Sequence, residues 1–294
     1  MPRAALLSIH ARVDGTHPSS WEDPSLVQLW GPRFSTYVVA ARDHAAFSLG
    51  RLPGDARGRQ RAEDMAALLH AFLAGRRLGD GEAGRGLGEN PNRFRYAAAT
   101  GTVLIRWDGA RQPTVWTVPR PEVDPLEARR ELARRYLHVF GPTTPAAFAQ
   151  WAGIAAAQAR SAFDALARSL TAVRTPIGEA WILNRDEPAF RASAGPAAAA
   201  RLLPSGDAYY LLQGVDRELL VPDTACRGSL WTSRVWPGAV LVAGEIVGTW
   251  RRAQANLTVQ PWRRLSRAER EAVEAEAACL PLPGVEGRIV VRWD

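Results

Sequence analysis

The clearest pattern of apolar and polar positions lies in the middle of the chain. Apolar residues recur at helical spacing over 125–140, directly after Asp124, a favourable N-cap. Similar spacing predicts a short helix over 145–153 and an Ala-rich helix over 155–170. Two β-prone runs then follow over 171–184, separated by turn residues. Three helices followed by a β-hairpin are typical of a winged helix-turn-helix, in which the third helix would face the DNA groove.

A weaker version of the same pattern lies upstream. Residues 61–73 have helical spacing, and alternating residues predict strands over 102–107 and 113–118. Asp and Gly at 108–109 predict a tight turn between these two strands. An extended segment is also expected at 34–40. The upstream region is therefore predicted to contain a second helix-plus-wing unit.

The pattern changes after residue 195, where short β-like runs are broken by Gly and Pro, as in a small barrel. Ser266 and Glu269 form a capping box that opens a C-terminal helix. The predicted fold class is therefore α+β: tandem winged helix-turn-helix units followed by a C-terminal β-barrel-like domain. The expected segments are an N-terminal winged-helix unit over 1–60, a second over 61–120, a third over 121–194, and the barrel-like domain with its helix over 195–294.

Composition excludes several classes of protein. With 294 residues, 47% of them hydrophobic, the chain is long enough for two or three cored units and is not generally disordered. No apolar run is long enough for a membrane-spanning helix, and we expect no signal peptide and no membrane partner. Two cysteines, Cys226 and Cys279, cannot make a disulfide framework or a zinc site. These features favour an intracellular, cytoplasmic protein.

The charge of the chain indicates a polyanionic partner. All 37 basic residues other than histidine are Arg, and none is Lys, which excludes Schiff-base, P-loop and kinase lysine chemistry. The net charge is +7, a balance that favours binding to nucleic-acid phosphates through counterion release.

Three separated motifs carry a resemblance to a known family. They are RRYLHVFGPTTPAAFAQWAGI at 134–154, RLLPSGDAYYLLQGVDRELLVP at 201–222 and VLVAGEIVGTWRR at 240–252. Together they resemble the bacterial winged-helix DNA-binding proteins that include the YcaQ and AlkZ interstrand-crosslink DNA glycosylases. The resemblance runs over nearly the whole chain in matching order. It implies tandem winged helices, a β-barrel, and excision of alkylated, often crosslinked, purines without a metal or cofactor.

The resemblance also locates a candidate catalytic loop. The family has a Gln-x-Gln or Gln-x-Asp motif near the N-terminus, and in this chain His10 and Arg12 occupy those two positions. A neutral His10 imidazole can accept a proton from water that attacks the sugar. The planar guanidinium of Arg12 fits a phosphate beside the lesion. Asp14 supplies a carboxylate, either to orient His10 or to counter the charge of an oxocarbenium ion.

The chain departs from the family in a second place. The family usually has a Trp-x-x-Arg-Gly-Thr-x-His strand, and here Trp30 and Arg33 are kept while Tyr37 replaces the His. The chain begins close to the catalytic motif, so we expect its N-terminal unit to be truncated. A structural role is the alternative for His10, and a surface ion pair is the alternative for Arg12 and Asp14.

Arginines on the predicted wings and helix starts are the candidates for DNA contact. They are Arg33, Arg93, Arg95, Arg106, Arg111, Arg174, Arg251 and Arg252. The five histidines show no metal-ligand spacing, so we expect no metal site.

The sequence thus favours a monofunctional DNA glycosylase, a hydrolase that acts as a monomer on damaged double-stranded DNA. Water would attack the C1′ carbon of a nucleotide whose base is cationic and leaves readily. The principal alternative is a non-catalytic winged-helix DNA-binding protein or transcriptional regulator. A third is an enzyme whose Arg12 adapts the pocket to another nucleic-acid lesion.

Overall fold

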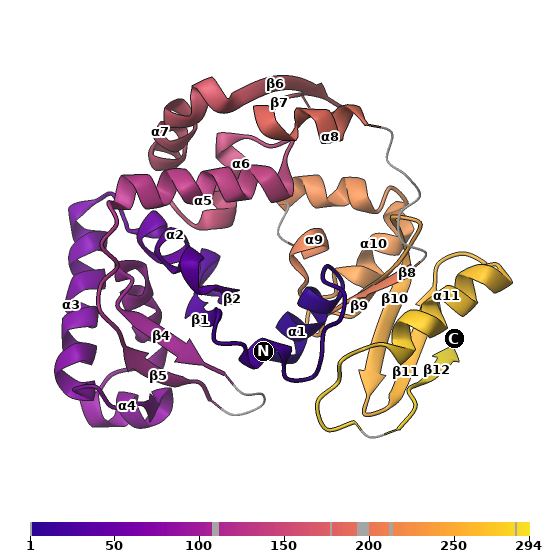
Figure 1. Cartoon of the computed structure of the whole chain (residues 1–294), viewed down its shortest axis with the longest axis horizontal. Coiled ribbons are helices and arrows are strands. Elements are labelled where there is room, and N and C mark those ends of the chain that lie inside the picture. The colour runs from indigo at the N-terminus through magenta and orange to yellow at the C-terminus, as the bar shows by residue number, and fades with distance from the viewer. Residues whose placement is uncertain (1, 108–111, 177, 193–199, 212–213, 286) are drawn as a thin grey trace. The chain divides into compact units, whose positions relative to one another are not determined.

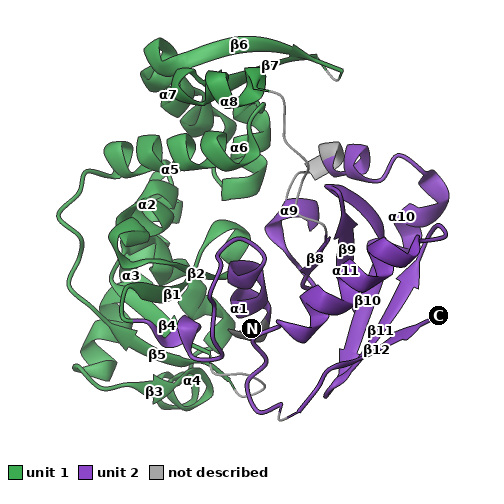
Figure 2. Ribbon diagram, turned by 45° about the vertical axis from the view of Figure 1, so that its right-hand side comes forward, with its two compact units in different colours: residues 1, 24–192 green, residues 2–23, 193–294 purple. Residues whose placement is uncertain are grey.

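A computed structural model describes residues 2–107, 112–176, 178–192, 200–211, 214–285 and 287–294 (Figure 1). The chain divides into two compact units, coloured separately in Figure 2. Unit 1 contains residues 24–192, and unit 2 combines residues 2–23 with residues 193–294. Both units mix helices and strands, which confirms the α+β class. No helix in the described ranges is long and apolar enough to cross a membrane.

Unit 1 contains an antiparallel five-stranded sheet in the order β2-β1-β4-β5-β3. Its strands are β1 (Leu26–Trp30), β2 (Thr36–Ala40), β3 (Leu78–Gly79), β4 (Val103–Arg106) and β5 (Thr114–Thr117). Three of them, β2, β4 and β5, confirm the predicted extended runs, while the turn predicted at 108–109 lies outside the described residues. Because the sheet takes strands from both sides of residue 60, the predicted segments 1–60 and 61–120 share one core.

Helix α3 (Ala56–Leu73) packs against this sheet. Its Leu69 and Leu73 lie in one buried cluster with Phe94, Val103 and Ile105. The helix confirms the prediction for 61–73 but starts earlier, because the Asp55 carboxylate caps its first turn by accepting from the Gly58 N–H. Two short helices complete this part of the unit, α2 (His44–Ser48) and α4 (Asp80–Leu87). Helix α4 lies in a Gly-rich stretch for which no element was predicted.

The central helices and hairpin form the other part of unit 1. They are α5 (Pro125–Phe140), α6 (Pro145–Ala152), α7 (Ala156–Leu166), β6 (Leu170–Thr175), β7 (Gly178–Leu183) and the short α8 (Glu187–Arg191). Asp124 caps α5 and Thr144 caps α6, as their positions predicted. Helix α7 ends four residues before the predicted end, because Leu170 already pairs with Leu183 as the first residue of the hairpin.

Unit 2 is built on a second five-stranded sheet, in the order β12-β11-β10-β9-β8. Its strands are β8 (Ala200–Leu203), β9 (Gly238–Val242), β10 (Glu245–Ala253), β11 (Asn256–Pro261) and β12 (Val290–Trp293). No pairing joins β12 to β8 within the described part of the chain, so the sheet is open there. The barrel-like closure expected from the sequence is therefore not seen in these strands.

Helices from both ends of the chain pack on this second sheet. They are α1 (Pro2–His10), α9 (Ala208–Leu211), α10 (Thr224–Leu230) and α11 (Arg267–Ala278). Leu7 of α1 lies in the same buried cluster as Leu202, Val240 and Val273. Ser266 and Glu269 form the predicted capping box of α11. The packing of α1 fixes the start of the candidate catalytic loop in unit 2.

Candidate functional site

The predicted catalytic loop follows directly from α1. Leu6 and Leu7 are almost fully buried and hold one face of the helix against the sheet of unit 2. Ser8 lies on the same helix, and Arg12 follows two residues beyond the helix end. His10 is the last residue of α1. The loop therefore leaves a rigid helix, which is the kind of support that a positioned polar site needs.

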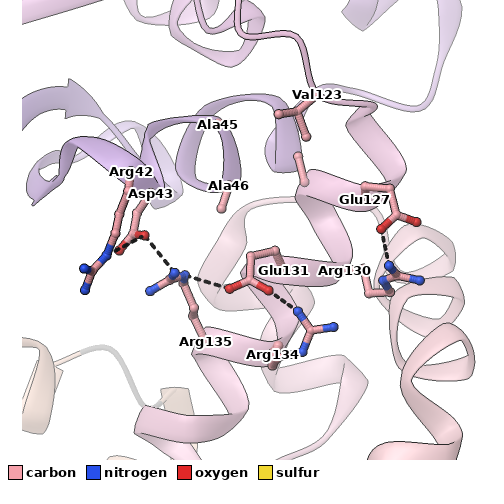
Figure 3. Close-up of a pocket in the computed structure, with 11 residues that line it drawn as sticks. Arg42, Asp43, Ala45, Ala46, Val123, Glu127, Arg130, Glu131, Arg134 and Arg135 are labelled. Atoms are coloured by element: carbon pink, nitrogen blue, oxygen red, sulfur yellow. Dashed lines mark hydrogen bonds and ion pairs between the residues drawn. The ribbon is translucent and has the colours of Figure 1, made fainter.

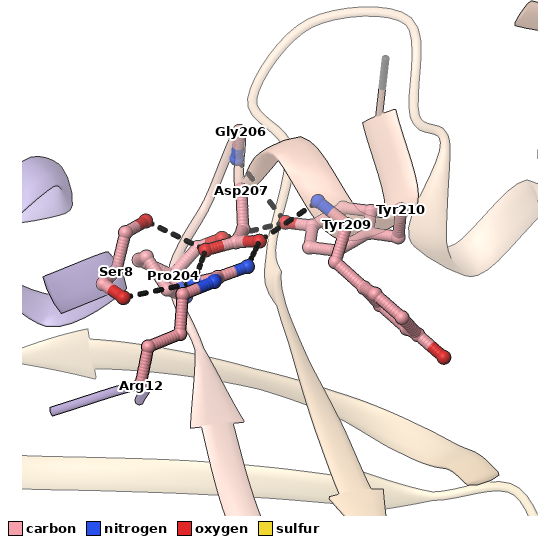
Figure 4. Close-up of polar contacts among 7 residues, drawn as sticks. All are labelled: Ser8, Arg12, Pro204, Gly206, Asp207, Tyr209 and Tyr210. Carbon is pink, nitrogen blue, oxygen red and sulfur yellow. Dashed lines mark hydrogen bonds and ion pairs between the residues drawn. The ribbon is translucent and has the colours of Figure 1, made fainter. Parts of the chain in front are cut away.

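Arg12 forms a two-pronged ion pair with Asp207 (Figure 4). Its Nη1 and Nη2 atoms lie 2.9 and 2.7 Å from the two carboxylate oxygens. Nη1 also donates to the carbonyl of Ser8 at 2.8 Å, and the Ser8 hydroxyl donates to Asp207 at 2.6 Å. The Asp207 side chain is fully buried, whereas that of Arg12 is 46% exposed. A buried carboxylate thus neutralises a guanidinium that still reaches solvent.

Asp207 is itself held by the turn that follows β8. One of its carboxylate oxygens accepts from the backbone N–H of Tyr209 at 2.9 Å, at the start of α9. The Tyr210 hydroxyl lies within hydrogen-bond distance of the carbonyls of Pro204 and Pro237, and it accepts from the Gly206 N–H. Burial raises the pKa of Tyr210, so this phenol stays neutral and acts as a structural tie.

The two ring nitrogens of His10 have different surroundings. Its Nδ1 atom lies 2.6 Å from the Thr16 hydroxyl. Its Nε2 atom is closed off from solvent, has no hydrogen-bond partner among the described residues, and lies 4.0 Å from a Glu276 carboxylate oxygen. Glu276 also accepts from the Leu202 N–H and pairs with Arg201. In this arrangement the imidazole is bonded within the loop through Thr16 and offers no free nitrogen to an outside water.

Asp14 is exposed and makes no hydrogen bond or ion pair with any residue that the structure describes. Two roles were considered for Asp14. The first, orientation of His10, has no supporting contact, because Thr16 occupies the Nδ1 atom of the imidazole. The other role, opposing positive charge on the sugar, needs only an accessible carboxylate. Asp14 meets that requirement.

The loop residues differ in what they can do chemically. Arg12 uses three of its five N–H donors on Asp207 and Ser8, so two remain for a phosphate oxygen. Asp14 is the accessible carboxylate, and His10 is a half-buried residue bonded to Thr16. No group of three or more His, Cys, Asp or Glu side chains within the described ranges is placed to hold a metal ion.

The predicted DNA-contacting arginines of unit 1 have different surroundings. Arg33 and Arg174 are exposed, the first in the β1–β2 connection and the second on β6. Arg93 pairs with Glu89 at 2.6 Å, and Arg95 donates to the Asn92 side chain at 2.7 Å. Arg106 lies at the end of β4. Arg111 lies outside the described residues.

The two predicted arginines of unit 2, Arg251 and Arg252, are neighbours on β10. Their side chains bond to backbone carbonyls, Arg251 to that of Val235 at 2.8 Å and Arg252 to that of Gln254. Arg251 is exposed and Arg252 is half-buried on this otherwise largely buried strand, and phosphate contact by either stays a prediction.

A pocket of about 260 Å³ lies between α2 and α5 in unit 1 (Figure 3). It is rich in arginine, but its charges are already paired. Arg135 contacts Asp43 at 2.7 Å, Arg134 pairs with Glu131, and Arg130 pairs with Glu127. We therefore do not assign this pocket to an anionic ligand.

Sequence reasoning missed the four partners of the loop: Ser8, Thr16, Asp207 and Glu276. Asp207 lies inside the motif at 201–222, so the resemblance pointed to its segment without giving it a role. Arg12 and Asp207 are 195 positions apart in sequence. No local spacing could have paired Asp207 with Arg12.

The chain is similar to known proteins over most of its length. A family described as DNA glycosylase AlkZ-like matches residues 1–280. An interstrand DNA cross-link repair glycosylase of Streptomyces sahachiroi is 30% identical over 176 residues, which cover 58% of this chain and 46% of that protein. The match thus spans about half the length of this curated relative. The solved structure of the Streptomyces sahachiroi DNA glycosylase AlkZ aligns with a TM-score of 0.77 and 21% identity, covering 99% of this chain and 90% of that one.

Proposed function

Because the chain belongs to the AlkZ-like DNA glycosylase family, we propose that it is a DNA repair glycosylase acting on alkylated purines in duplex DNA. The observation that carries the proposal is the family match over residues 1–280, which includes both units and the loop with Arg12 and Asp14. The net charge of +7 is consistent with a duplex as substrate. The protein would act in the cytoplasm as a monomer, without a metal or cofactor.

The proposal includes a tandem winged-helix arrangement for holding the duplex. Helices α5, α6 and α7 with the β6–β7 hairpin have the order of a winged helix-turn-helix, and Arg174 lies exposed on the hairpin. In this arrangement α7 faces the groove, and Arg174 contacts a phosphate. The sheet of unit 1 with α3 would be the second unit, and Arg33 would add a further phosphate contact.

The proposed reaction is hydrolysis of an N-glycosidic bond. Water attacks the C1′ carbon, the bond to the base breaks, and its electron pair neutralises the cationic alkylated base. Such a leaving group needs no general acid, so a site with few titratable residues suffices. The positive charge that develops on the sugar needs a nearby negative group.

We propose that different residues of the loop perform these tasks, and the loop geometry supports this division. Asp14 opposes the charge of the sugar and accepts the proton of the water. Arg12 binds a flanking phosphate with its two remaining donors while Asp207 fixes the plane of its guanidinium. His10 holds the loop through Thr16, and it becomes a base only if the imidazole turns outward.

Release of N7-methylguanine from a methylated duplex under single-turnover conditions tests the proposal. Asp14→Asn keeps the size of the side chain but removes its charge, and we expect release to slow by about 100-fold. Glu271→Gln, which removes an exposed charge from α11 in the same unit, should leave the rate unchanged. If the unaltered chain binds alkylated duplexes but releases no base from any of them, the glycosylase proposal is wrong.

A non-catalytic DNA-binding protein is the second candidate, and one observation favours it. The Nδ1 atom of His10 bonds Thr16, its Nε2 atom is closed off from solvent, and Arg12 is already paired, so two of the three motif residues are engaged within the protein. In that case His10→Ala and Asp14→Ala would leave duplex binding intact, and no variant would release base. The third possibility, another nucleic-acid lesion, predicts release from a different damaged duplex by the same loop.

A further inference from the structure

The connection between β1 and β2 has an unusual backbone. Arg33 and Phe34 both have left-handed conformations, with φ of 55° and 59°. Left-handed backbone costs a residue with a side chain about 1 kcal/mol or more relative to the right-handed form, and glycine takes it freely. Two such residues in succession therefore raise the conformational free energy of the folded chain. Strain of this kind persists where the surroundings enforce it, and it is concentrated at functional sites.

Hydrogen bonds around residues 33–34, the tip of the β1–β2 connection, hold the backbone in this conformation. The Gly31 N–H donates to the carbonyl of Ser35 at 2.8 Å and closes the turn. Arg51, which is only 6% exposed, donates to the carbonyls of Trp30 at 2.9 Å and Ala152 at 3.1 Å. A buried guanidinium thus ties the end of β1 to the end of α6. The bond between Gly31 and Ser35 spans the tip, and the bonds of Arg51 hold the strand end from which the tip starts.

The Phe34 ring that the tip displays belongs to a series of aromatic and cationic groups. It meets the Tyr96 ring edge to face, with centroids 5.4 Å apart and an interplanar angle of 89°. The Arg51 guanidinium lies 5.5 Å from its centroid, and that of Arg61 lies 4.2 Å from the centroid of Tyr96. Despite these contacts Phe34 remains 36% exposed. The ring is fixed in direction and still open to a partner.

We propose that Phe34 is a stacking platform for a nucleobase of bound DNA, and that the exposed Arg33 beside it contacts the adjoining phosphate. The ligand class rests on the proposed function, since it takes DNA as the partner. A planar base fits an exposed, immobilised ring, and nearby guanidinium groups favour an electron-rich partner strand. Glycine at position 34 would form the same turn with less conformational strain. The aromatic ring is therefore the feature that the protein gains from a phenylalanine there.

A duplex with 2-aminopurine opposite an abasic site tests this inference, because stacking on an aromatic ring quenches that base. Phe34→Gly removes the ring and relieves the backbone, so the relief offsets part of the stability lost with the contacts to Tyr96 and Arg51, and a melting curve checks that the variant is folded. We expect it to bind the duplex about ten-fold more weakly and to lose the quenching. Phe34→Tyr should keep both properties.

Phe190→Gly is the matched control, because Phe190 is also exposed, at 52%, and makes no ring contact among the described residues. Its binding and quenching should equal those of the unaltered chain. If Phe34→Gly binds and quenches normally, or if the unaltered chain binds no duplex, the stacking inference is wrong. Binding and quenching by a chain that releases no alkylated base would contradict the glycosylase proposal alone.

Discussion

The two units hold a key arginine in different ways. In unit 1, Arg51 is enclosed with backbone carbonyls as its hydrogen-bond partners, and it forms no ion pair among the described residues. Burial lowers its pKa to about 10, although nearby Tyr37 opposes the shift. In unit 2, Arg12 stays half exposed while its partner, Asp207, is the buried member of a two-pronged pair. Unit 1 therefore desolvates a charge without a counter-ion, and unit 2 provides one.

The difference shows two uses of the same side chain. A guanidinium bound to carbonyls from separate segments fixes the backbone, as Arg51 does for β1 and α6. Arg129 repeats this pattern by donating to the carbonyls of Gly50 and Leu52. A guanidinium bound to a buried carboxylate is instead fixed in its own orientation, with donors left over for a ligand. The first arrangement builds the scaffold, and the second prepares a binding group.

Arg51→Ala should give the largest loss of stability. It leaves two buried carbonyls without donors and opens a cavity, each of which costs about 1–3 kcal/mol, while the recovered desolvation offsets part of the total. We expect the free energy of unfolding to fall by about 3 kcal/mol, measured by urea denaturation followed by circular dichroism. Arg57→Ala, at an exposed position of α3, should change it by less than about 0.5 kcal/mol. Equal effects of the two substitutions would show that Arg51 does not hold the scaffold.

Arg12→Ala should have the second largest effect, because it strands the fully buried Asp207 carboxylate. Removing one partner of a buried pair costs about 3–5 kcal/mol, and solvent access to Arg12 reduces the expected loss to about 2 kcal/mol. Asp207→Asn should cost less, about 1 kcal/mol, since the freed guanidinium can turn toward water. The same urea measurement on the double variant gives the coupling between the two residues. Additive losses would mean that the pair contributes nothing by its pairing.

Local sequence signals explain why much of the fold could be predicted. The caps at Asp124, Thr144 and Ser266 act within three residues of themselves, so they are visible in the sequence and are present in the structure. The β6–β7 hairpin follows from two neighbouring runs. The packing of α1 with the C-terminal segment gave no such signal, because it joins the two ends of the chain.

The candidate site was predictable only in part for the same reason. The loop of His10, Arg12 and Asp14 is contiguous, and its position could be taken from a family motif. Its electrostatics depend on Asp207 and Glu276, which come from distant elements. The orientation of His10 depends on Thr16 and the surface of α11, and a sequence alone does not place these groups beside the imidazole.

Acid should lower the stability of the two units in different pH ranges. We expect these changes in stability to be smaller than those of the substitutions above. Burial lowers the pKa of His44 in α2 from its ordinary value of 6.5. The unfolded chain therefore takes up this proton more readily than the folded chain, so the contribution of His44 to stability is complete above pH 6.5 and is lost as the pH falls below it. The melting temperature of the unaltered chain should fall between pH 7.5 and 5.5. His44→Gln should flatten this part of the profile.

Glu269 in unit 2 provides the counterpart to His44. Its bonds to Arg263 and to the Ser266 cap lower its pKa from 4.5 to about 2. Its contribution is therefore present above pH 4.5 and is lost as the pH falls toward 2, so Glu269→Gln should leave the profile between pH 7.5 and 5.5 unchanged and flatten it at lower pH. The two pH ranges differ because His44 is desolvated without a counter-ion among the described residues, whereas Glu269 is paired with Arg263. Flattening of the upper range by Glu269→Gln, or of the lower range by His44→Gln, would contradict it.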